Sequence, residues 1–177
     1  MDDIEIIGQV IGVFAVIVLF TAYQMKSRKS LLLVQAFGIA LISTQYFMIG
    51  ATSGAVLNVV CLVRTLFFLF TEGKINNNLF KKYIFPIFFA VMVCVFSIFS
   101  WEGWYSSFML VALAVNSFCT GVCNPQDFRK SLIFTCILAF IYNVIVFSIG
   151  GMMNELLSIV SAIIGIVRYE KQLKSNK

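Results

Sequence analysis

The stretch FMIGATSGAVLNVVCLVR, from Phe47 to Arg64, decides the fold of this chain. It ends one apolar run at a glycine-containing turn without charge, and then begins a second run that carries Asn58 and Arg64. One hundred residues later the pattern returns as FSIGGMMNELLSIVSAIIGIVR, from Phe147 to Arg168. The segments before the two copies are also alike: SRKSLLL at residues 27–33 and FRKSLIF at residues 128–134. Repetition over such a distance predicts two related structural units in one chain.

The composition of the chain identifies its broad class. Of the 177 residues, 60% are hydrophobic, 12% are charged and nineteen are phenylalanine. A soluble domain of this length exposes too much of its surface to water to hide so many apolar side chains. The apolar residues also form long uncharged blocks, each close to the ~20 residues that cross a bilayer as a helix. We therefore predict an all-α integral membrane protein in a lipid bilayer.

The apolar blocks predict seven transmembrane helices joined by short connections. Their expected ranges are 4–24, 31–49, 54–70, 83–100, 106–122, 132–149 and 152–169. The leading residues of the first segment, Asp2, Asp3 and Glu5, are acidic where a signal peptide would carry positive charge, so we expect this helix to be retained.

Basic residues alternate along the chain in a way that predicts its orientation. They follow the first, third, fifth and seventh expected helices: Lys26, Arg28 and Lys29; Lys74, Lys81 and Lys82; Arg129 and Lys130; Arg168, Lys171, Lys174 and Lys177. The positive-inside rule then puts the N-terminus outside and the C-terminus in the cytoplasm of a multi-pass protein. Because the basic residues are scattered over four short edges, we expect no nucleic-acid partner.

The repeat and the odd number of helices together predict the domain organisation. Residues 1–72 form a first three-helix unit, residues 73–105 a linker helix with its loops, and residues 106–177 a second three-helix unit with a cytoplasmic tail. A single linker helix lets the two units lie parallel, in a 3+1+3 arrangement around an axis along the membrane normal. Such an arrangement favours a central pathway between the units.

A Gln-then-basic-Ser element follows the first helix of each unit: Tyr23-Gln24 with Arg28-Lys29-Ser30, and Pro125-Gln126 with Arg129-Lys130-Ser131. With the 3+1+3 arrangement, this element resembles the SWEET and PQ-loop superfamily of transporters. The resemblance implies passive or exchange-type movement of a small polar solute by alternating access. It also implies a hinge at Pro125 and Gln126.

Further landmarks resemble the YgjV family of bacterial inner-membrane proteins over essentially the whole chain. They are GQxxG at residues 8–12, Asn58 before Arg64, Ser148-Ile149-Gly150-Gly151 with Glu155, and Ile166-Val167-Arg168. This resemblance implies a multi-pass protein of the bacterial cytoplasmic (inner) membrane.

Sugar-carrying relatives in the superfamily share a pair of Asn residues that faces the substrate, one on the third helix and one on the last. Asn58 fits the first position. Its counterpart is Ser158 when the two copies are aligned from the glycine, or Ala162 when they are aligned from the arginine. Because neither is Asn, the sequence does not favour a sugar.

Polar residues inside the expected helices are the candidate substrate-binding residues, because an unpaired polar group facing lipid is costly. The candidates are Asn58, Asn116, Tyr142, Asn143, Ser158 and Ser161. The alternative for each is a hydrogen bond or a close contact between packed helices. For the GxxxG pattern at Gly8 and Gly12, helix packing is the favoured interpretation.

Two arginines end the repeated blocks. Arg168 is expected at the membrane edge, and Arg64, about two turns from the cytoplasmic end of its helix, is within reach of that edge. We therefore predict an interfacial, structural role for Arg64 and Arg168 at the cytoplasmic edge.

The sequence contains few groups for chemical catalysis. It has no His, and no two carboxylates are expected inside the bilayer, so we predict no enzymatic activity, no metal site and no cofactor. Glu155 is expected near the outer end of the last helix, so proton coupling is not expected. The leading hypothesis is a facilitator or exchanger, and a homo-oligomer is compatible with the sequence. The alternative is a membrane interaction protein without transport activity, or a solute-binding subunit that needs a partner.

Overall fold

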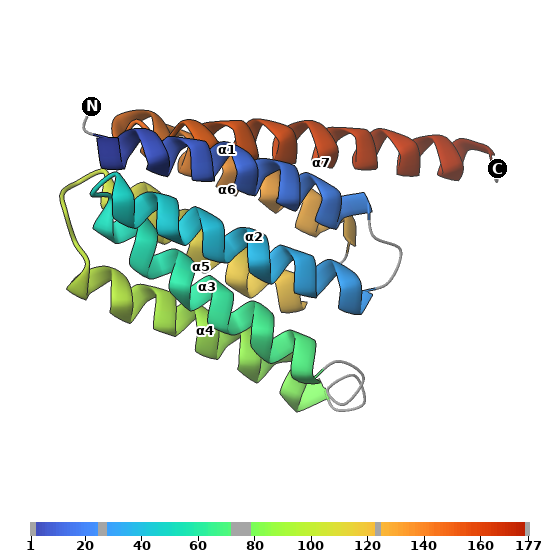
Figure 1. The fold of residues 1–177 in the computed structure, drawn as a ribbon. Helices are drawn as coiled ribbons and strands as arrows, with labels where there is room; N and C mark the ends of the chain where they lie inside the picture. The colour runs from blue at the N-terminus through green and yellow to red at the C-terminus, as the bar shows by residue number, and fades with distance from the viewer. Residues whose placement is uncertain (1–2, 25–27, 72–78, 123–124, 176–177) are drawn as a thin grey trace.

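A computed structural model describes residues 3–24, 28–71, 79–122 and 125–175 of the chain, and seven α-helices make up nearly all of this part (Figure 1). The helices are α1 (Asp3–Gln24), α2 (Arg28–Met48), α3 (Thr52–Thr71), α4 (Leu79–Phe99), α5 (Ser106–Val122), α6 (Pro125–Ile145) and α7 (Ile149–Ser175). Consecutive helices run in opposite directions, so the two termini lie at opposite ends of the bundle (Figure 1).

The lengths of the helices agree with a membrane protein. Among the described residues, five helices are long and apolar enough to cross a bilayer, namely α1, α2, α3, α6 and α7. The other two, α4 and α5, contain shorter apolar stretches at Tyr83–Phe99 and Ser106–Cys119. Below, the Gly50 end is the end with the α2–α3, α4–α5 and α6–α7 connections, and the Arg28 end is the opposite one.

The predicted helix limits lie within four residues of the observed ones, except at the start of α6 and at the end of α7, which is Ser175 instead of residue 169. Helix α6 begins at Pro125, seven residues before its expected start, because proline is well accepted at the first position of a helix, where no N–H bond is lost. Helix α7 begins at Ile149, three residues before its expected start at residue 152.

Six of the helices form a ring, in which α1 contacts α2, α2 contacts α3, α3 contacts α5, α5 contacts α6, α6 contacts α7 and α7 contacts α1. Helix α4 lies outside this ring and packs on α3 and α5 (Figure 1). Phenylalanine rings form part of the contact between α3 and α4. Phe67 of α3 packs against both Phe85 and Phe89 of α4, with ring centroids 4.8 Å and 5.6 Å apart.

The bundle exposes large apolar side chains on its outside and buries several polar ones within its core. Large apolar side chains such as Phe20 and Phe37 are exposed on its outside, whereas Gln45 and Asn143 are fully buried. This distribution suits a lipid environment, in which polar groups must find their partners inside the protein.

Small residues bring α1 close to α2 and α7. A Cβ atom on Gly12 would overlap the carboxamide of Gln45, and one on Gly8 would lie 2.9 Å from Met48 Cβ. A Cβ on Gly150 would lie 2.5 Å from the backbone of Gly12. The prediction that the GxxxG pattern serves helix packing is therefore confirmed.

The α2–α3 and α6–α7 connections share one backbone hydrogen-bond pattern. Ala51 N–H donates to Tyr46 C=O, and Ser148 N–H donates to Asn143 C=O, both at 2.9 Å. The residue before each donor is left-handed, with φ of 74° at Gly50 and 55° at Phe147, as is common just after a helix.

This shared pattern sets a register of 97 residues between the two halves. Helices α2 and α6 begin 97 residues apart and end 97 residues apart, and so do the starts of α3 and α7. The sequence pairing of Gly50 with Gly150 is therefore wrong by three residues, because Phe147 adopts the conformation that glycine has in the first copy.

Candidate functional site

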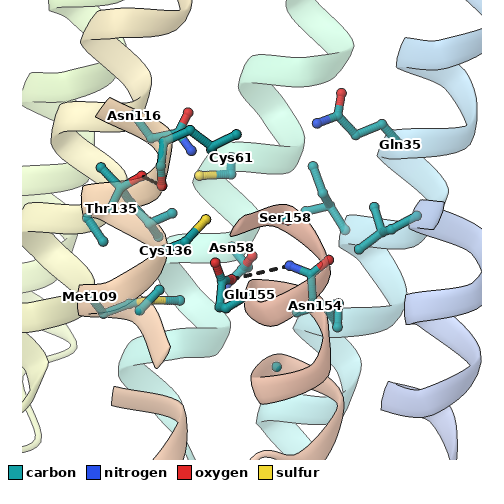
Figure 2. Close-up of a pocket in the computed structure, with 18 of the residues that line it drawn as sticks. Gln35, Asn58, Cys61, Met109, Asn116, Thr135, Cys136, Asn154, Glu155 and Ser158 are labelled. Atoms are coloured by element: carbon teal, nitrogen blue, oxygen red, sulfur yellow. Dashed lines mark hydrogen bonds between the residues drawn. The ribbon is translucent and has the colours of Figure 1, made fainter. Parts of the chain in front are cut away.

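A cavity of about 120 Å³ lies inside the ring, enough for several water molecules. All six ring helices contribute to its wall. Figure 2 shows polar side chains from α2, α3, α5, α6 and α7 around it. These polar residues are Gln35, Tyr46, Asn58, Arg64, Asn116, Thr135, Asn154, Glu155 and Ser158.

The cavity wall follows the 97-residue register. Six pairs of lining residues are separated by that interval: Leu19 and Asn116, Gln35 and Leu132, Ile39 and Cys136, Ile42 and Ala139, Asn58 and Glu155, Cys61 and Ser158. The positions match but the chemistry does not, since two of the pairs combine a polar side chain with an aliphatic one and Asn58 is paired with the carboxyl group of Glu155. The cavity is therefore built by corresponding parts of the two halves and is chemically asymmetric.

The counterpart of Asn58 is Glu155, not Ser158 or Ala162 as the sequence copies suggest. The Asn58 amide donates to the C=O of Gly54 on its own helix at 2.9 Å, and its side chain lines the cavity. Glu155 occupies the corresponding place on α7. Figure 2 shows both side chains in the central part of the site.

Glu155 was expected near the outer end of its helix, and the structure corrects this. Because α7 begins at Ile149, Glu155 lies six residues inside the helix, about 9 Å along its axis. Its Oε1 accepts a hydrogen bond from the Asn154 side-chain amide at 3.2 Å, and the Cys136 thiol is within hydrogen-bond reach. A carboxyl group therefore lies in the cavity wall.

Arg64 also lies in the cavity wall. Its side chain is 8% exposed, and Nη1 donates to Ser117 Oγ on α5 at 2.6 Å. This hydrogen bond joins α3 to α5, which gives Arg64 a contact between the two halves. The predicted structural role at a membrane edge remains a prediction.

Tyr142 and Asn143 lie beside the cavity, at the Gly50 end. Asn143 Oδ1 accepts a hydrogen bond from the Tyr46 hydroxyl, and the Tyr142 hydroxyl accepts one from Gly54 N–H at 2.8 Å. The Tyr46 and Tyr142 rings meet edge to face, with centroids 6.2 Å apart. Both predicted residues are fully buried in the contacts between α2, α3 and α6.

Two side chains from outside α2, α3 and α6 form further hydrogen bonds at the Gly50 end. Glu102, in the α4–α5 connection, accepts hydrogen bonds from the Thr52 N–H at the start of α3 and from the Tyr142 hydroxyl. Gln9 of α1 accepts one from the Ile149 N–H at the start of α7, at 2.9 Å, and donates to Phe147 C=O. The first residue of α3 is therefore bonded to the α4–α5 connection, and the first residue of α7 to the first half.

The other predicted site residues are distributed as follows. Asn116 and Ser158 line the cavity, whereas Ser161 is exposed on the outside of α7. Pro125 is the first residue of α6 and lies three residues beyond the last residue of α5. The side chains of Gln126 and Arg168 are outside the described residues. Binding and hinge roles for this set remain predictions.

The sequence analysis did not select three residues that the structure brings to the site or to the Gly50 end. They are Glu155 in the cavity wall, and Glu102 and Gln9 at the helix starts. Glu155 could have been found from Ser158, because residues three apart share a helix face. Glu102 and Gln9 act on helix starts more than forty residues away in the sequence, so no local pattern points to them.

Comparison with known families gives one result. The family Imp-YgjV, described as bacterial inner membrane protein, matches residues 6–173. Searches of curated proteins and of solved structures gave no match. Since the match spans nearly the whole chain, including every ring helix, the chain belongs to the YgjV family of bacterial inner-membrane proteins.

Proposed function

We propose that the chain is a transporter that moves a small polar solute across the inner membrane by alternating access of two three-helix units. The observation that carries this proposal is a polar cavity walled by all six ring helices, inside a bundle whose outer surface is apolar. Ionisable groups inside membrane helices are costly and commonly mark solute pathways. The cavity holds two such groups, Arg64 and Glu155.

The pattern of helix neighbours supports two equivalent units, α1–α3 and α5–α7. When α1, α2 and α3 are exchanged for α5, α6 and α7, each contact of the ring is replaced by another contact of the ring. The 97-residue register of the cavity wall has the same symmetry. In this proposal α4 is the linker that keeps the units parallel, as in the SWEET and PQ-loop superfamily.

The hydrogen bonds between the halves support a closed outer gate. In the proposed topology the N-terminus is outside, so the Gly50 end is the outer end. There the bonds of Tyr142 with Gly54, Tyr46 with Asn143, and Gln9 with Ile149 join the two halves. Glu102 of the linker bonds to Thr52 of the first half and to Tyr142 of the second. Nearer the Arg28 end, Arg64 donates a hydrogen bond from the first half to Ser117 of the second.

The proposal is tested by uptake into liposomes that contain the purified protein. The solute panel comprises sugars, nucleosides, vitamins, amino acids and organic anions, and at least one class is expected to enter above the rate of empty liposomes. If every class fails with correctly folded protein, the transport function is refuted.

A matched pair of variants links uptake to the cavity. Ser158→Trp places a large ring in the cavity wall and is expected to abolish uptake, whereas Ser161→Trp, three residues on, adds it to the exposed face. Equal uptake by both variants would contradict a pathway through this cavity.

A further inference from the structure

We infer that the cavity binds a small zwitterion, with its anionic group at Arg64 and its cationic group at Glu155. This inference rests on the proposed transport function and names the solute class of the same site. A guanidinium group and a carboxyl group line one cavity, and within the described residues neither forms an ion pair with another side chain.

Arg64 supplies the anion-binding group. A guanidinium carries five N–H donors, and Ser117 Oγ is the one side-chain partner that the described residues give it. The side chain is more than nine-tenths buried, and it lines the cavity. Its remaining donors suit a carboxylate, which guanidinium groups bind through two parallel hydrogen bonds.

Glu155 supplies the cation-binding group. Its carboxyl faces the Asn154 amide and the Cys136 thiol, which are both uncharged partners. An ammonium group carries three donors, and the carboxyl has acceptor positions beyond the one that Asn154 uses. A primary ammonium in the cavity would therefore complete the hydrogen bonds of Glu155.

Charge balance favours a solute with both groups. An uncharged solute would leave both protein charges unpaired at low dielectric, and a singly charged solute would leave one of them unpaired. A zwitterion pairs with both and brings no net charge into the membrane. Arg64 lies six residues beyond Asn58, about 9 Å along α3, while Glu155 corresponds to Asn58. The two charges therefore lie at different depths, which suits a zwitterion aligned with the bundle axis.

Binding to the purified full-length protein in detergent tests this inference. The probes are two zwitterions, L-alanine and 4-aminobutyrate, and singly charged analogues, lactate, butyrate and butylamine. We expect at least one zwitterion to raise the Tm and to bind at least about tenfold more tightly than its singly charged analogues.

Matched variants locate the two groups. Arg64→Gln and Glu155→Gln are each expected to weaken zwitterion binding at least about tenfold, and Arg64→Lys, which keeps the charge, to weaken it less. Arg129→Gln and Asp127→Asn are controls at the start of α6, where Arg129 bonds to Gly165 C=O and Asp127 is exposed. If Arg64→Gln does not fold, zwitterion binding is compared between Arg64→Lys and Glu155→Gln. Binding by Glu155→Gln is then expected to be the weaker of the two.

The outcomes separate this inference from the proposed function. Equal binding of zwitterions and singly charged analogues, or unchanged zwitterion binding by the folded variants, would overturn the inference. Zwitterion binding without uptake into liposomes would refute transport and leave the binding site standing. Uptake of another solute class without zwitterion binding would overturn the zwitterion site and leave the transport function standing.

Discussion

The Tyr46 hydroxyl donates a hydrogen bond to the side-chain oxygen of Asn143, 97 residues further along the chain. Since 97 residues is also the register between α2 and α6, the two residues occupy equivalent positions and contact one another. In the proposed arrangement of two equivalent units, two equivalent positions touch only near the axis that relates the units. The contact lies at the Gly50 end, directly beside the cavity that Tyr46 lines.

Replacing Tyr46 by Phe should destabilise the Gly50 end. The Asn143 Nδ2 atom already has no partner in the described structure, and the loss of the Tyr46 hydroxyl would leave the Oδ1 atom unpaired as well. We expect a loss of about 1–3 kcal/mol in unfolding free energy, measured by denaturation in detergent micelles. Tyr105→Phe is the control, because Tyr105 packs against the Tyr142 ring and no described hydrogen bond involves its hydroxyl.

The starts of α3 and α7, each bonded to a side chain outside its own three-helix unit, should respond separately. Glu102→Ala removes the acceptor for Thr52 N–H, and Gln9→Ala removes the acceptor for Ile149 N–H. Loss of a helix cap costs about 0.5–2 kcal/mol. Amide exchange at the affected helix start should therefore accelerate by about two- to thirtyfold. Hydrogen exchange of each variant reports on the starts of both α3 and α7. Equal acceleration at both starts in either variant would contradict the expectation that Glu102 acts on α3 and Gln9 on α7.

Two glycines should differ in how strongly alanine destabilises the fold. At Gly150 a Cβ would lie 2.5 Å from the Gly12 backbone, which cannot rotate away, so α1 and α7 must separate. We expect a cost of about 2–3 kcal/mol there. At Gly50 a Cβ meets nothing within 4 Å, but φ is 74°, which costs about 1–2 kcal/mol. Thermal unfolding of the two variants should show the larger loss for Gly150→Ala.

Cysteine labelling should show which end of the cavity admits water. Cys61 and Cys136 line the cavity, whereas Cys94 is exposed on the outside of α4. With the outer gate closed, a membrane-impermeant thiol reagent is expected to label single-cysteine variants at positions 61 and 136 from the cytoplasmic side. Cys94, facing lipid, should stay unlabelled from either side. Labelling of Cys136 from the outside would contradict the proposed closed gate.

Much of the architecture was predictable from local sequence. Continuous apolar blocks predicted the helices, because a segment that must satisfy its own backbone in lipid has to be helical. The close approach of α1 to its neighbours was predictable from Gly8 and Gly12, because small residues allow helix backbones to meet. Asn58, Asn116 and Ser158 were singled out as polar residues in apolar helices, and the structure places them in one cavity wall.

The register between the halves could not be obtained from sequence identity. Aligning Gly50 with Gly150 gives an interval of 100 residues, whereas the shared hydrogen bonds of the two turns give 97. The difference arises because Phe147, which is 78% exposed, adopts the left-handed conformation that Gly50 has in the first copy. The tertiary surroundings set this backbone conformation, so the residue type at position 147 does not reveal it.

The sequence by itself determined the membrane class, the number of helices and their approximate limits, because these follow from the hydrophobicity of contiguous residues. The tertiary structure alone decided that Glu155 and Arg64 line one cavity with Asn58, and that Glu102 and Gln9 bond to helix starts at the Gly50 end. These facts depend on where a helix starts and which distant helix it packs against. Both are properties of the whole bundle, and no single segment encodes them.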